Sequence, residues 1–72
     1  MEEKNPIQVA GRLFGALELL AVNGAMGLME IANTLELNKS TAHRILNSLI
    51  HLGYVQQNHQ NGKYELDVYK RQ

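Results

Sequence analysis

The sequence predicts a single, mostly α-helical domain that ends in a small β-hairpin. Three observations predict it. Two apolar patterns with helical spacing flank a short connection, a third such pattern precedes them, and the last part of the chain changes to the alternating pattern of strands. A chain of 72 residues forms one small core. We place the domain at residues 7–66, after a flexible lead-in at residues 1–6 and before a tail of doubtful origin at residues 67–72.

The first predicted helix covers the segment "VAGRLFGALELLAVN", and the Asn23-Gly24 pair supplies a stop signal. Gly11 and Gly15 lie four residues apart within it. This spacing either marks a face that another backbone approaches closely or is a tolerated weakness that costs up to about 1 kcal/mol per glycine. The apolar residues with helical spacing are Ala10, Leu13, Phe14, Leu17, Leu20 and Ala21.

The second and third predicted helices are joined by the tight connection "ELN". The second covers roughly residues 29–35, with Met29 or Leu28, Ile31, Ala32 and Leu35 facing inward. Asn38 is a favourable cap for the third helix, and Gly53 is a typical residue just past a helix end. The third helix is therefore about 14 residues long. Its apolar stripe consists of Ala42, Ile45, Leu46, Leu49 and Ile50.

The end of the chain predicts a β-hairpin. The segments "YVQQ" and "KYEL" alternate between apolar and polar residues, and the loop "NHQNG" separates them. Its Asn61-Gly62 pair is a strong hairpin signal. Two helices joined by a tight turn, preceded by a supporting helix and followed by a hairpin, make a winged helix-turn-helix of three helices plus a wing.

The charge distribution indicates the kind of partner. Seven Lys and Arg residues balance seven Asp and Glu residues, and zero net charge argues mildly against nucleic acid. However, no acidic residue lies between Glu36 and Glu65, where the chain carries Lys39, Arg44, Lys63 and three histidines. One face of a neutral domain can therefore be locally basic.

The outer face of the third helix predicts contact with DNA. Ser40, Arg44, Asn47 and His51 lie opposite the apolar stripe, with His43 and Ser48 on its flanks. A helix at residues 38–52 fits the major groove, and its N-terminal half reads bases. The wing at residues 58–63 would contact the flanking backbone or the minor groove. The candidate DNA-binding residues are Arg12, Asn38, Lys39, Ser40, Thr41, His43, Arg44, Asn47, His59, Gln60 and Lys63.

Other interpretations compete with this one. The acid-free face is either a solvated surface or a protein-docking surface without DNA binding, and Arg12 is either an ordinary exposed charge or a clamp on a flanking phosphate. Catalysis, a metal site and a cofactor are not expected. The chain has no cysteine, and His43 and His51 are eight residues apart rather than the four of a zinc-binding helix. No apolar run approaches the roughly 20 residues of a membrane span, and the start lacks a secretion signal, so we expect a cytoplasmic protein.

Several segments resemble the N-terminal DNA-binding domain of IclR-type bacterial transcriptional regulators. These are Glu30-Ile31-Ala32, the run "LNKSTAHR" from Leu37, the "LxxLGYV" pattern that ends at Val55, and Tyr64-x-Leu66. The resemblance covers residues 7–66. It implies binding to double-stranded operator DNA as a homodimer, paired through helix one and through a C-terminal effector-binding domain that is absent here. Residues available for pairing on helix one are Val9, Gly11, Leu13 and Gly15, whereas the ending "DVYKRQ" departs from the family linker.

Overall fold

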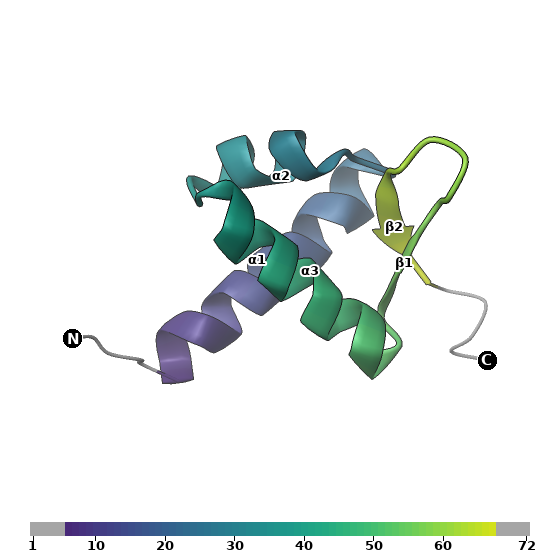
Figure 1. Cartoon of the computed structure of the whole chain (residues 1–72). Helices are drawn as coiled ribbons and strands as arrows, with labels where there is room; N and C mark the ends of the chain where they lie inside the picture. The colour runs from purple at the N-terminus through teal and green to yellow at the C-terminus, as the bar shows by residue number, and fades with distance from the viewer. Residues whose placement is uncertain (1–5, 68–72) are drawn as a thin grey trace.

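Three helices and a two-stranded hairpin form the molecule, as the sequence predicts (Figure 1). The computed structural model describes residues 6–67. The helices are α1 (Pro6–Asn23), α2 (Leu28–Leu35) and α3 (Lys39–Leu52), and the strands are β1 (Val55–Gln57) and β2 (Tyr64–Leu66). In Figure 1, α3 crosses in front of α1, with α2 along one side and the hairpin at one end. No helix within residues 6–67 is both long and apolar enough to cross a membrane.

The core lies where the inner faces of the three helices meet the hairpin. Its buried residues are Ala16, Leu20, Ile31, Ala32, Ala42, Ile45, Leu46, Leu49, Val55 and Tyr64. Four of them come from α3, whose predicted apolar stripe is confirmed, with Ile50 partly buried at its edge. Because the apolar face of α3 is buried in the core, the opposite face of this helix points toward solvent.

Two apolar positions of the first predicted helix, Phe14 and Ala21, are exposed in the structure. Phe14 has helical spacing with the apolar residues of α1, yet 64% of its surface is exposed, because the buried face of α1 centres on Ala16 and Leu20. In α2, where the sequence leaves Met29 or Leu28 as the inward residue, Leu28 packs against the core and Met29 is 53% exposed. A domain this small buries only a narrow stripe of each helix, so apolar residues at the edge of a stripe stay in solvent.

Both ends of α3 form as the sequence predicts. The Oδ1 atom of Asn38 accepts a hydrogen bond from the Thr41 backbone N–H at 3.0 Å. At the other end, Gly53 has a φ of 89° and donates its N–H to the Ile50 carbonyl at 3.0 Å. Between α2 and α3, Glu36 also has a left-handed conformation, with a φ of 58°. These bonds set the length and the start of α3.

The hairpin is anchored to the helices by a pairing that the sequence does not predict. β1 and β2 are antiparallel, with Val55 opposite Leu66 and Gln57 opposite Tyr64. On the other side of β2, Tyr64 pairs with Met26 of the α1–α2 connection through backbone hydrogen bonds of 2.9 and 2.7 Å. The hairpin is therefore held between α3, which precedes it, and the end of α1.

Candidate nucleic-acid interface

The outer face of α3 is polar and exposed, as predicted. Ser40, His43, Arg44, Asn47, Ser48 and His51 are all exposed on the side away from the buried stripe. Arg44, Asn47, Ser48 and His51 line a shallow surface hollow along the C-terminal half of the helix. The site predicted from the sequence does not include Ser48 and His51, although their spacing places them on the same arc. This face therefore extends over the full length of α3.

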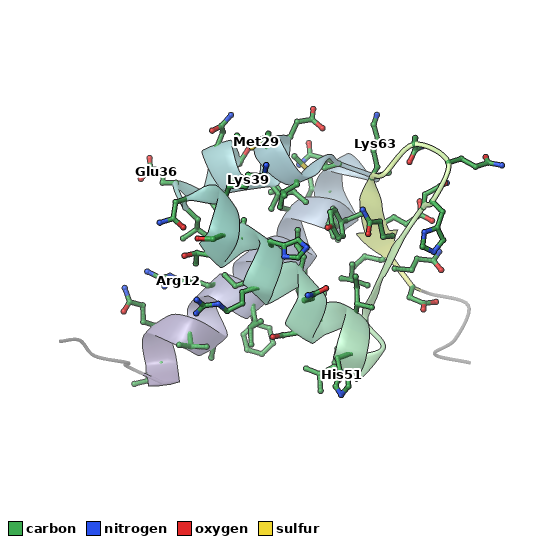
Figure 2. The ribbon with its side chains drawn as sticks, viewed as in Figure 1. Arg12, Met29, Glu36, Lys39, His51 and Lys63 are labelled. Atoms are coloured by element: carbon green, nitrogen blue, oxygen red, sulfur yellow. The ribbon has the colours of Figure 1, made fainter. Side chains whose placement is uncertain are left out.

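The start of α3 combines a structural cap with a basic side chain. Asn38 Oδ1 accepts the Thr41 N–H and, at 3.3 Å, the Ser40 hydroxyl. Asn38 and the backbone of Thr41 thus hold the helix end, and the Thr41 side chain is half-buried. Lys39 is exposed at this end of α3 (Figure 2). The strongest candidates for DNA contact at this end are therefore Lys39 and Ser40.

Basic side chains from two other elements flank α3. Arg12 of α1 is half-buried and projects on the side where α3 begins, and Lys63 projects from the hairpin on the other side of α3 in the same view (Figure 2). His59 and Gln60 are exposed in the loop at residues 58–63. Cationic groups thus come from α1, α3 and the hairpin.

Backbone hydrogen bonds and side-chain caps hold the hairpin loop in one conformation. The Asn58 N–H donates to the Lys63 carbonyl at 2.8 Å, and the Gly62 N–H donates to the Asn58 carbonyl at 2.7 Å. Asn58 Oδ1 accepts the Gln60 N–H, and Asn61 Oδ1 accepts the Lys63 N–H. Gly62 has a φ of 74°, which glycine adopts without strain. The loop therefore presents His59, Gln60 and Lys63 from a defined backbone.

Several carboxylates have structural roles away from this surface. Glu30 accepts the Gly27 N–H at 2.9 Å and so satisfies a backbone donor at the start of α2. Glu65 accepts a hydrogen bond from the Gln56 side chain at 2.8 Å, and Asp67 is only 4% exposed. Within residues 6–67 no group of three or more His, Asp or Glu side chains is placed to hold a metal ion. The exposed face of α3 therefore carries cationic and hydrogen-bonding groups and no carboxylate.

An exposed helix of this composition, set behind a tight turn and followed by a hairpin, defines the winged helix-turn-helix class of DNA-binding domains. The model of the IclR helix-turn-helix domain matches residues 9–59, and the chain belongs to this family. The resemblance inferred from the sequence is therefore confirmed. The family is one of transcription-regulator domains and not of enzymes.

Curated relatives are transcription regulators by name. The chain is 33% identical over 68 residues to the HTH-type transcriptional regulator KdgR of Escherichia coli, covering 92% of this chain and 26% of the relative. It is 46% identical over 61 residues to the glycerol operon regulatory protein of Streptomyces griseus, covering 83% of this chain and 24% of the relative. The chain thus spans about a quarter of the length of these relatives.

Solved structures of similar sequence share the fold. An IclR transcriptional regulator from Alicyclobacillus acidocaldarius superimposes with a TM-score of 0.81 at 28% identity, over 94% of this chain and 27% of that one. HmgR of Pseudomonas aeruginosa gives a TM-score of 0.78 at 26% identity, over 89% of this chain and 27% of that one. The arrangement of helices and hairpin is therefore that of the family.

Proposed function

We propose that this domain binds double-stranded operator DNA in a sequence-specific manner and thereby regulates transcription. The observation that carries the proposal is the exposed, acid-free face of α3, which is flanked by Arg12 on one side and by the hairpin on the other. The names of the relatives support it, because they are regulators that carry this same domain. Such a protein acts where the chromosome lies, and we place it in the cytoplasm.

In this proposal α3 lies in the major groove, which is wide enough to admit one α-helix. Arg44 and Asn47 have the side chains that pair with guanine and adenine edges, and Ser40 adds a smaller hydrogen-bonding group. Lys39 and Arg12 contact phosphates beside the groove and set the register of the helix. The wing at residues 58–63 contacts the flanking backbone or the minor groove through His59, Gln60 and Lys63.

The test is the fluorescence anisotropy of labelled duplex DNA titrated with the chain, first at low salt and then across a salt series. We expect affinity to fall as salt rises, with a log–log slope of about −0.9 for each phosphate contacted. Lys39→Ala should then reduce the magnitude of this slope by about 0.9. If the chain does not bind DNA at the lowest salt, the α3 face serves another partner, such as a protein.

We also propose that the domain pairs with a second copy through α1. Val9 and Gly11 are exposed, and no atom lies within 4 Å of a Cβ placed at Gly11. Phe14 borders an apolar groove of ≈ 290 Å³ between α1 and the end of α3, together with Leu13, Leu17, Leu52 and Tyr54. At Gly15, in contrast, an added Cβ would lie 3.6 Å from the Leu35 side chain of the same domain. This glycine is therefore not available to a partner.

Sedimentation equilibrium tests this pairing. We expect the weight-average mass of the chain to rise with concentration toward that of a dimer, and Phe14→Asp to keep the chain monomeric, because a charge in an apolar interface is costly. Val22→Asp is the matched control, since Val22 is an exposed apolar residue near the other end of α1. A chain that stays monomeric at every concentration would remove α1 as the pairing surface, and equal effects of the two substitutions would remove the groove beside Phe14 as the contact.

A further inference from the structure

All three histidines of the chain lie on the surface that we propose for DNA. His43 and His51 are exposed on α3, and His59 is exposed in the hairpin loop. His51 marks the C-terminal end of the α3 face (Figure 2). Among the described residues, the hydrogen bonds include none from an imidazole. These imidazoles are therefore open to an external partner.

The groups near each histidine are mainly neutral or cationic. His43 shares a surface hollow with Lys39 and Ser40, and His51 shares another with Arg44 and Asn47. His59 lies in the same loop as Lys63. The charged residues on the elements that pack against α3 or form the hairpin are Arg12, Glu18, Glu30, Glu36, Lys63, Glu65 and Asp67. No ion pair joins any of these carboxylates to a histidine within residues 6–67.

We propose that DNA binding by this domain is coupled to proton uptake at His43, His51 and His59, and that His51 is a phosphate-contacting residue. The inference rests on the proposed function, because it concerns the same surface. It adds His51 to the proposed DNA-contact residues. It also makes the fraction of DNA sites that the domain occupies depend on pH.

Protonation of the three histidines is a large change for this domain, because its net charge is otherwise zero. At neutral pH the seven basic and seven acidic residues cancel, whereas three protonated imidazoles give the chain a net charge of +3. Every added charge lies on one surface. Between Glu36 and Glu65, protonation adds three charges to the three of Lys39, Arg44 and Lys63.

The direction of the effect follows from linkage. A nearby phosphate favours the charged form of an imidazole, so the complex binds more protons than the separate molecules do. Affinity is therefore highest at low pH, and it falls as the pH rises. An imidazolium also donates from both ring nitrogens, whereas a neutral imidazole donates from one.

The experiment measures DNA affinity by anisotropy at several pH values between about 5.5 and 8, at constant ionic strength, with circular dichroism at each pH to monitor the fold. We expect tighter binding and a steeper salt dependence at low pH. Each phosphate contact changes the slope of log affinity against log salt by about −0.9. For each histidine that gains such a contact, the affinity for DNA at 0.1 M salt should therefore rise on the order of eightfold.

Glutamine variants separate the contributions. The triple variant His43→Gln, His51→Gln, His59→Gln should bind with nearly the same affinity at all these pH values, and His51→Gln alone should show a reduced pH dependence. The single variants provide the same comparison if the triple variant does not fold.

A wild-type affinity that varies with salt but not with pH, or a triple variant that keeps the full pH dependence, would overturn the inference and leave the proposed function intact. Loss of the pH effect in His43→Gln and His59→Gln but not in His51→Gln would overturn the assignment of His51. An absence of DNA binding at every pH would instead remove the proposed function.

Discussion

Replacing Leu46 with alanine is expected to lower the free energy of unfolding by about 2–5 kcal/mol. Leu46 is 0% exposed on the inner face of α3, where it packs in the cluster that also contains Ala16, Ile31 and Val55. The truncation removes buried methyl groups and leaves a cavity that the close-packed neighbours fill only in part. The inner face of α3 is therefore the part of the molecule most sensitive to loss of volume.

The size of the domain makes this loss decisive. A core in a chain of this length contributes only a few kcal/mol of net stability, so a loss of about 2–5 kcal/mol leaves a large unfolded fraction. Urea unfolding followed by circular dichroism measures the effect. Leu52→Ala provides the matched control, because Leu52 lies on the same helix but is 59% exposed. Equal losses for the two substitutions would show that the packing around Leu46 does not stabilise the fold.

The local signals in the sequence predict the helices well. Asn38 and Gly53 mark the ends of α3, because a side-chain cap and a left-handed C-terminal residue depend only on their immediate neighbours. The angular positions on the helix likewise predict which side chains of α3 face solvent, and the exposed Ser40, Arg44 and Asn47 confirm them. This part of the candidate site therefore follows from helical periodicity alone.

Features that depend on distant segments are not predicted. The pairing of Met26 with Tyr64 joins residues far apart in the sequence, and Met26 lies in a connection with no strand pattern. The exposure of Phe14 depends on which side of α1 meets α3, since its helical spacing fits an apolar stripe. The left-handed conformation of Glu36 also has no signal, because glycine or asparagine is the usual residue there. Arg12 is a candidate from the sequence, but only the packing of α1 on α3 places it beside the candidate site.

The separation of charge explains how a neutral chain can bind a polyanion. Glu30 and Glu65 accept hydrogen bonds within the domain, and Asp67 is buried beyond β2. Their charges thus lie on α2 and at the hairpin strands, and the α3 face carries none. The field that DNA meets depends on this local distribution more than on the net charge, because interactions beyond about 8–10 Å are screened at ordinary salt.

Arg44→Ala is expected to give the largest change in DNA binding of any single substitution on α3. Arg44 is exposed at the middle of the outward face, and its hollow also contains Asn47 and His51. If its guanidinium reads guanine, the substitution should cost about 1–3 kcal/mol and relax the sequence preference at one base pair. If it contacts a phosphate, binding to all sequences should weaken, and the magnitude of the salt slope should fall by about 0.9.

Anisotropy with operator and random duplexes across a salt series separates these two roles of Arg44. The fold should persist, because Arg44 is exposed and alanine is the most favourable helix residue. Ala21→Glu is the matched control. It lowers the net charge by one unit, as Arg44→Ala does, but at an exposed position in the last turn of α1. If the control weakens binding equally, net charge and not Arg44 is responsible. An unchanged affinity of Arg44→Ala would place the DNA contact elsewhere on the domain.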